Sequence, residues 1–111
     1  MIGIDVGGKV FKTLLGNLAK AERTSTLYML YTQIITGTIR PDEHFNYFLD
    51  RDPKCFRYIL NYLRDGRLIL PNDGHTAAQL FAEAESLGLT GLAGRLSNYV
   101  KRNPGIVKIP L

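Results

Sequence analysis

The stretch FLDRDPKCFRYILNYLRDG, residues 48–66, contains the clearest structural signals in this chain of 111 residues. Asp52 followed by Pro53 places a helix-capping carboxylate before the residue that is favoured at the first position of a helix. The apolar residues that follow recur at steps of three and four, which predicts a helix with one buried face: Phe56, Ile59, Leu60 and Leu63. Gly66 is expected to end this helix. The aromatic-rich run Phe45–Leu49 in front of it predicts a strand.

Two more strands are predicted at the N-terminus, joined by a tight turn. Ile2, Ile4 and Val6 alternate with Gly3 and Asp5, and a Gly7-Gly8 pair separates them from a second run that ends at Thr13. A glycine pair between two such runs is typical of a hairpin with a primed turn. The domain is therefore expected to open with a strand pair.

The segment from Gly3 to Lys9 also approaches the spacing of a phosphate-binding loop. Such a loop needs Ser or Thr after the lysine to hold magnesium, and a helix whose N-terminus receives the phosphate. Val10 follows Lys9 in this chain, and a strand is predicted there. A hairpin turn is therefore the preferred interpretation over a nucleotide site.

Two helices are predicted between the hairpin and the strand at residues 45–49. Thr13 can cap a short helix, and Thr24 or Ser25 can cap a longer one that ends near Gly37. The apolar residues at helical spacing in these two segments are Leu14, Leu15 and Leu18, then Leu27, Leu30, Tyr31 and Ile34. The mixture of Gly, Pro and acidic residues in Thr36–Glu43 predicts an exposed loop.

Two final helices are predicted after the short apolar segment Leu68–Leu70 and a turn at Asn72–Gly74. Thr76 is expected to cap the first of them and Thr90 the second. Their apolar faces are Ala77, Leu80, Phe81, Ala84 and Leu87, and then Leu92, Leu96 and Val100. Asn103-Pro104-Gly105 should end the last helix. The whole order predicts a mixed α+β domain in which a small sheet packs on helices.

The composition is that of one ordinary globular domain, with 45% hydrophobic and 22% charged residues. A single cysteine, Cys55, excludes an intramolecular disulfide and a four-thiolate zinc site. No apolar run approaches the roughly 18 residues that a membrane-spanning helix needs, and no signal sequence is evident. These features predict a cytoplasmic protein with no direct membrane contact.

The formal net charge of +4 does not indicate nucleic-acid binding. Of the 14 Lys and Arg residues, Lys101, Arg102 and Lys108 fall in the C-terminal tail, which leaves 11 basic residues against 10 acidic ones before it. A domain that follows a phosphate backbone carries its cations as a stripe. Here they are scattered among acids, so no nucleic-acid partner is expected.

No constellation in the sequence is typical of catalysis. His44 and His75 both fall in predicted loops, away from ligand-spaced Cys or carboxylate residues, and Cys55 sits on the first turn of a helix as a small packing group. Glu83 and Glu85 are two apart on a helix and therefore diverge. The sequence predicts a protein that is not an enzyme and that needs no cofactor or metal.

A charged cluster surrounds the end of the predicted strand and the helix after it. Its members are Asp50, Arg51, Asp52, Arg57, Arg64, Asp65 and Arg67. The cluster can be a capped and solvated helix surface, or it can be a subunit interface in which Arg and Asp form directional pairs. The residue types alone leave these two interpretations open.

Four ordered motifs resemble those of a known family. They are Ile4–Thr13, Phe48–Pro53, Phe56–Gly66 with the following Leu70-Pro71, and Leu80–Glu85, and the likeness extends over about residues 2–100. Together they resemble the BTB/POZ domain of the potassium-channel tetramerisation type. The segments Asp50–Pro53 and Asn61–Gly66 are more similar to the KCTD-like proteins of that type than to channels.

The resemblance implies a fold and a function. The fold is α+β, with a three-stranded sheet packed against about five helices over residues 1–101 and an apolar, basic tail at 102–111. The function is a non-enzymatic module that forms closed homo-tetrameric or homo-pentameric rings, and KCTD-like members commonly act as substrate adaptors that dock a cullin scaffold of a ubiquitin ligase. The alternatives are the cytoplasmic tetramerisation domain of a potassium channel and a BTB corepressor.

The resemblance also implies residues for two contact surfaces. A ring needs a heterologous interface, in which one face of a subunit meets a different face of the next. The positions that match it are Asp5, Lys9, Thr13, Asp50, Arg51, Asp52, Arg57 and Arg64. Cullin docking would involve residues 40–46 and 87–92, represented by Arg40, Asp42, His44, Phe45, Leu87 and Leu89. The zinc site of the channel domains needs several cysteines, so no metal is implied here.

Overall fold

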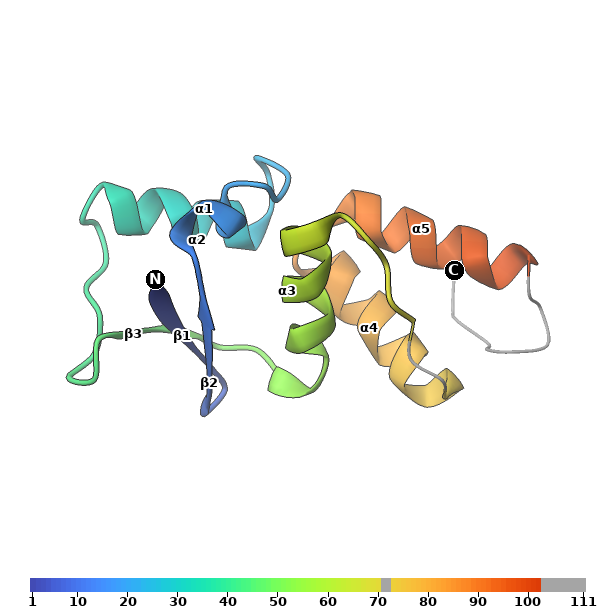
Figure 1. Cartoon of the computed structure of the whole chain (residues 1–111), viewed down its shortest axis with the longest axis horizontal. Coiled ribbons are helices and arrows are strands. Elements are labelled where there is room, and N and C mark those ends of the chain that lie inside the picture. The colour runs from blue at the N-terminus through green and yellow to red at the C-terminus, as the bar shows by residue number, and fades with distance from the viewer. Residues whose placement is uncertain (71–72, 103–111) are drawn as a thin grey trace.

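A computed structural model of the chain describes residues 1–70 and 73–102, and it shows the mixed α+β fold that the sequence predicts (Figure 1). In this part of the chain the strands are β1 (Ile2–Val6), β2 (Lys9–Thr13) and β3 (Asn46–Leu49). The helices are α1 (Leu15–Leu18), α2 (Thr26–Ile35), α3 (Phe56–Asp65), α4 (Gly74–Ser86) and α5 (Thr90–Arg102), and a short 3₁₀ turn, η1 (Pro53–Cys55), leads into α3.

The N-terminal hairpin has the predicted turn. Strands β1 and β2 pair antiparallel, and both turn glycines have positive φ, 55° at Gly7 and 105° at Gly8. Two positive φ values are the requirement of a type I′ turn. Asp5 Oδ1 accepts a hydrogen bond of 2.8 Å from Gly8 N and closes the turn. A strand follows the glycine pair, as the hairpin interpretation requires.

The third strand completes the sheet from the other side of β1. It pairs parallel with β1, which gives the strand order β2-β1-β3. It begins at Asn46, one residue later than predicted, because Phe45 has a left-handed backbone with φ 64°. The order places β2 and β3 at opposite edges of the sheet, which matters for the surfaces described below.

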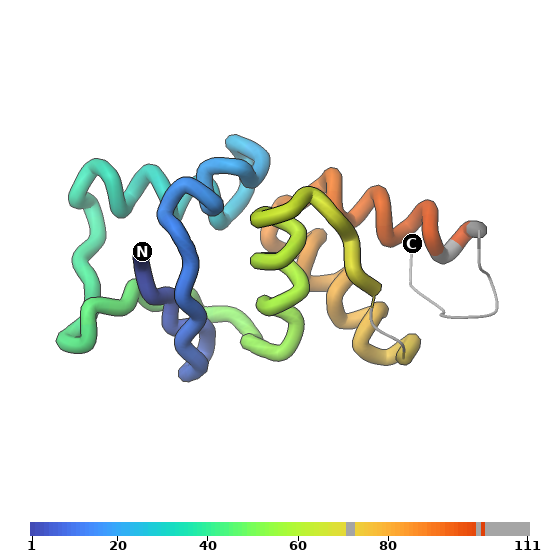
Figure 2. Tube along the Cα trace, in the orientation of Figure 1, coloured from blue at the N-terminus to red at the C-terminus, as the bar shows by residue number. Residues whose placement is uncertain are grey.

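The core continues from the sheet into the helices. In Figures 1 and 2, α1 and α2 lie above the strands, α3 stands in the middle, and α4 and α5 lie at the far end. The predicted apolar face of α3 is buried, and so is that of α4. Ile4, Val6 and Phe11 of the hairpin belong to the same buried cluster. The apolar periodicity of the sequence therefore identified these helix faces correctly.

Several predicted helix caps are confirmed and others are wrong. Ser25 caps α2, because its side chain accepts from Tyr28 N at 3.2 Å, and Asp52 accepts from Lys54 N at 3.0 Å. Thr13 does not cap α1: it is a buried residue of β2, and Leu14 holds the cap position without a side-chain bond.

The predicted start of α4 is also corrected. Asp73 is its cap, since Oδ1 accepts from Thr76 N at 2.7 Å, so Thr76 already lies inside the helix. His75 is therefore a helix residue and not a loop residue. The apolar segment Leu68–Leu70 connects α3 and α4 without regular secondary structure. Pro71, Asn72 and the tail from Asn103 lie outside the described residues, as does the predicted helix end at 103–105.

The start of α5 is capped from a distant part of the chain. Thr90 is not the predicted cap, because it is the first residue of the helix and its hydroxyl donates to Glu22 Oε2 at 3.0 Å. The same oxygen accepts from Gly91 N at 2.8 Å. Partial burial disfavours the charged carboxylate, but these hydrogen bonds outweigh it and lower the pKa of Glu22. The contact ties the segment after α1 to the last helix.

Replacing Glu22 with glutamine should lower the free energy of unfolding by about 1 kcal/mol at neutral pH, the usual size of a lost helix cap. Because the folded-state pKa is below the ordinary value of 4.5, the carboxylate contribution is complete above that value and is lost as the pH falls through the folded-state pKa. Urea unfolding from pH 7 to pH 3 measures both effects. The two proteins should converge in acid, and a constant difference over that range would contradict the assignment.

No helix in residues 1–70 and 73–102 combines the length and apolar character needed to cross a bilayer.

Candidate functional site

The face of the sheet that points away from the buried cluster carries two exposed apolar side chains. The register places Asp5 of β1 between Val10 of β2 and Phe48 of β3, while the neighbouring row is Lys12, Gly3 and Asn46. Val10 is 43% exposed and Phe48 is 61% exposed, whereas Ile4 and Val6, which point to the other face, are completely buried. We call these six residues the outer sheet face: Gly3, Asp5, Val10, Lys12, Asn46 and Phe48. An exposed apolar pair on a sheet is typical of a surface that another chain covers.

The two rows of the outer sheet face pack differently. A Cβ on Gly3 would lie only 2.0 Å from Asn46 Oδ1 and 3.2 Å from Lys12 Nζ, so these two side chains close over the glycine. The lysine ammonium thus lies across the sheet. The row that contains Val10, Asp5 and Phe48 remains the open part of this face.

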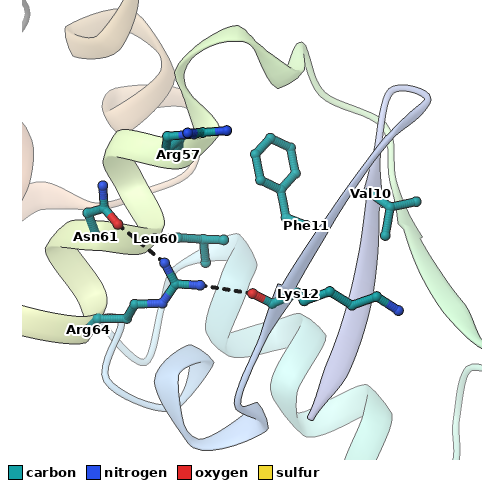
Figure 3. A pocket seen from close by; sticks show the side chains of 7 residues that line it. All are labelled: Val10, Phe11, Lys12, Arg57, Leu60, Asn61 and Arg64. Carbon is teal, nitrogen blue, oxygen red and sulfur yellow. Dashed lines mark hydrogen bonds between the residues drawn. The ribbon is translucent and has the colours of Figure 1, made fainter.

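A pocket of about 360 Å³ lies between β2 and α3 (Figure 3). We call it the basic pocket. It is lined by Val10, Phe11, Lys12, Arg57, Leu60, Asn61 and Arg64. Arg64 bridges the two elements: Nη2 donates to the Lys12 carbonyl at 2.8 Å, and Nη1 donates to Asn61 Oδ1 at 3.2 Å. Lys9 Nζ lies 5.4 Å from the centre of the Phe11 ring, beside the pocket. The β2 edge of the sheet is therefore cationic.

The β3 edge leads into the loop Asp50–Asp52. Its two carboxylate residues are exposed, but its arginine points into the protein. Arg51 forms a two-pronged contact with Glu83 of α4, with Nη2–Oε1 at 2.6 Å and Nε–Oε2 at 3.2 Å. This hydrogen-bonded contact raises the pKa of Arg51. Because Arg51 is turned inward, the outward charge of the loop is negative.

The loop in front of β3 presents an aromatic ring to solvent. Phe45 is 79% exposed and has a left-handed backbone, which is rare for a large side chain. Asp42 organises the loop: its Oδ1 accepts from His44 N and Asn46 N at 2.8 and 2.9 Å. These hydrogen bonds, the one from Asn46 foremost, lower the pKa of Asp42. An exposed, locally strained residue held by such bonds is a candidate for binding.

The eight residues implied for the ring interface separate into two groups. Lys9, Asp50, Asp52, Arg57 and Arg64 are exposed, and Asp5 is half-buried between Val10 and Phe48. Thr13 is buried, where its Oγ1 accepts from Asn17 Nδ2 at 3.0 Å, and Arg51 is paired with Glu83. The buried Thr13 side chain is thus not available for a contact between subunits, whereas Arg51 packs its loop against α4 and keeps 34% of its side chain exposed.

The residues implied for cullin docking also fall into two groups, one exposed and one buried. Arg40, Asp42, His44 and Phe45 are exposed and belong to one loop. Leu87 and Leu89 have exposed fractions of 1% and 0%, because they fill the core at the connection between α4 and α5. A partner cannot contact these two leucine side chains in the folded chain, so this part of the sequence-based prediction is wrong.

The residues that were considered for catalysis or metal binding do not form a cluster in the structure. His44 is exposed and lies 3.7 Å from Glu43, while His75 lies on the first turn of α4. Cys55 is buried, and its burial raises the pKa of the thiol, which disfavours the nucleophilic thiolate. Within residues 1–70 and 73–102 no three His, Cys, Asp or Glu side chains are grouped in a way that could hold a metal ion.

Val10, Phe48 and Glu83 were not predicted from the sequence as members of these surfaces. The first two become one exposed pair only through the strand order, since they lie on strands that are separated by β1. The alternation of polar and apolar residues in β2 was a usable signal for Val10, because Phe11 is the core residue of that strand. Nothing local indicates that Glu83 pairs with a residue 32 positions earlier.

The comparison with protein families agrees with the fold. A family model of the BTB/POZ domain, of the potassium-channel tetramerisation type, matches residues 2–96, which includes all three strands and the first four helices. Domains of this type are protein–protein interaction modules that oligomerise. The chain therefore belongs to the BTB/POZ family, as a domain of the potassium-channel tetramerisation type.

Proposed function

We propose that this chain is the ring-forming part of a KCTD-like adaptor: copies associate head to tail into a closed ring of four or five, and the ring docks a cullin scaffold of a ubiquitin ligase. The observation that carries the self-association is the outer sheet face, where Val10 and Phe48 expose apolar surface beside Asp5. A sheet is stable in water when its apolar face is covered by another layer. A second copy of the chain supplies that layer.

A closed ring also requires that each subunit use two different surfaces. The chain offers them at the two edges of one sheet, because β2 borders the basic pocket and β3 leads into the exposed carboxylates of residues 50–52. The loop that contains Phe45 lies before β3, whereas the carboxylates of residues 50–52 follow that strand, and it exposes the Phe45 ring. Aromatic side chains that enter a partner pocket contribute most of the binding energy in many interfaces. Phe45 is thus the proposed anchor for the cullin.

The first test measures self-association through Phe48. The wild-type chain should sediment at four or five times the monomer mass, and Phe48→Glu should shift it toward monomer, because a carboxylate would be desolvated in the contact. Met29→Glu on α2 places the same charge at another exposed apolar site and should keep the ring. Circular dichroism verifies that both variants fold. A wild-type chain that stays monomeric at high concentration would exclude the ring.

The second test measures cullin docking through Phe45. Phe45→Gly removes the phenyl group. It also relieves the strain of the positive φ at this position, because glycine adopts such a φ readily, so folding should be unaffected or slightly improved. Affinity for a cullin N-terminal fragment should fall about 30-fold, the effect of losing about 2 kcal/mol at a binding hot spot. Isothermal titration calorimetry measures it, with Ile69→Gly as the control at another exposed apolar residue. Unchanged affinity would remove Phe45 from the docking surface, and no binding by the wild type would refute the adaptor role.

A further inference from the structure

The cationic edge of the sheet has an arginine without a partner. Arg57 lines the basic pocket and is exposed, and among the described residues it has neither an ion pair nor a hydrogen-bond acceptor. Its neighbour Arg64 is held by the Lys12 carbonyl and Asn61, as Figure 3 shows. No carboxylate of the described residues lines this pocket. The pocket therefore carries positive charge, and no carboxylate of the described residues neutralises it there.

The opposite edge has an exposed carboxylate that forms neither a hydrogen bond nor an ion pair among the described residues. Asp50 directly follows β3, is exposed, and has no hydrogen bond or ion pair among residues 1–70 and 73–102. Asp52 is already engaged, because it caps η1 through Lys54 N. Arg51 lies between the two acids in sequence, but its guanidinium is bound to Glu83. The inward turn of Arg51 is what leaves the Asp50 carboxylate available.

We propose that Arg57 in the basic pocket of one copy receives the Asp50 carboxylate of the next copy. The pairing rests on the ring proposed above and states which charges join its subunits. Arg57, on α3, lines the pocket beside β2, whereas Asp50 directly follows β3, and these two strands are the edges of the sheet in the order β2-β1-β3. Among the described residues these two groups form no hydrogen bond or ion pair with each other within one copy. A contact between unlike edges of two copies is heterologous, as a closed ring requires.

The chemistry of the two groups fits this contact. A guanidinium and a carboxylate form a planar, two-pronged pair whose geometry fixes the register between chains. Phe11 and Leu60 in the pocket wall reduce the access of water, which strengthens the attraction between the charges. Association should weaken as salt increases, since the approach of the two edges is electrostatic.

Charge exchange tests the pairing directly. Arg57→Asp and Asp50→Arg should each weaken self-association by about 30-fold or more, the effect expected when one partner of a desolvated charge pair is lost. The double variant, Arg57→Asp with Asp50→Arg, should form rings again, because the attraction is restored in reverse. Arg67→Asp changes an exposed arginine outside the pocket and should have no effect. Native mass spectrometry and sedimentation measure the ring in each case.

Mixing the two single variants adds a test of ring size. In each single variant the two proposed contact positions carry like charges, because Arg57→Asp places an aspartate opposite Asp50 and Asp50→Arg places an arginine opposite Arg57. The contact position of one variant attracts that of the other, so the subunits of an equimolar mixture should alternate. Alternation closes only with an even number of subunits. A four-membered ring should therefore reappear in the mixture, whereas a five-membered ring should not.

The outcomes separate this pairing from the ring itself. A wild-type ring that survives both single variants refutes the pairing and leaves the ring intact. Loss of the ring in both single variants without recovery in the double variant also refutes it, because the two groups would then not face each other. A monomeric wild type refutes the proposed function and the pairing together. Circular dichroism of every variant establishes that the subunits are folded.

Discussion

Phe56→Ala should lower the free energy of unfolding by about 3–5 kcal/mol, the range for removing a large aromatic side chain from a core. Phe56 is 2% exposed and is the first residue of α3, where its ring lies 5.1 Å from the ring of Phe11. It therefore joins the helix to the hairpin as well as filling the core. Domains of this size are stable by about 5–15 kcal/mol, so the loss removes a large fraction of the total.

Urea unfolding monitored by circular dichroism measures this loss. The midpoint should fall markedly while the slope stays constant, which indicates a change in stability and not in the unfolded state. Phe48→Ala is the matched control, because it deletes the same ring from an exposed site. In the monomer its effect should be within about 0.5 kcal/mol. Equal losses in the two variants would contradict the assignment of Phe56 to the core.

Arg51→Glu should cost about 2–4 kcal/mol of folding stability. Glu83 is only 16% exposed and Arg51 is 34% exposed, so the pair is partly desolvated. Losing one partner of a buried pair costs about 3–5 kcal/mol and of an exposed pair about 0–1, and the present pair lies between these limits. The glutamate would also place two carboxylates together where Nη2 and Oε1 are now 2.6 Å apart.

A double variant in which the two charges are exchanged provides the control for Arg51→Glu. The swapped variant, Arg51→Glu with Glu83→Arg, should recover part of the stability, because the unlike charges face each other again; a double-mutant cycle at dilute, monomeric concentration measures the coupling. A loss of less than about 0.5 kcal/mol in Arg51→Glu would show that the contact contributes little. Because Arg51 acts within the subunit, a loss of ring in this variant would accompany a loss of folding, unlike the loss expected for Asp50→Arg.

The sequence identified most helices because their signals are local. The cap formed by Asp52, the left-handed Gly66 after α3 and the apolar spacing of Phe56 to Leu63 all act within a few residues, and all appear in the structure as predicted. The three wrong caps have a similar origin. Thr13, Thr76 and Thr90 are good capping residues, but hairpin pairing takes Thr13 into β2, Asp73 begins α4 earlier, and the distant Glu22 caps α5, which begins at Thr90.

The candidate surfaces were predicted only in part, because exposure depends on distant contacts. Leu87 and Leu89 match positions implied for docking, yet the packing of the α4–α5 connection buries them. Val10 and Phe48 were not singled out, because each is an ordinary apolar strand residue until its partner across β1 is known. Among the residues implied for docking, Phe45 is the one that the structure places as an exposed aromatic.

What the sequence by itself determined is the succession of strands and helices, the faces that form the core and the BTB/POZ family, since periodicity, caps and ordered motifs can be read along the chain. Only the tertiary structure decided which charges of Asp50-Arg51-Asp52 face outward. The reason is physical: Arg51 pairs with Glu83, which lies 32 residues later, and the strand order puts β3, which leads into Asp50, and β2, which borders the pocket of Arg57, at opposite edges of the sheet. The direction in which each of these neighbouring side chains points is therefore set only when the strands pair and the helices pack.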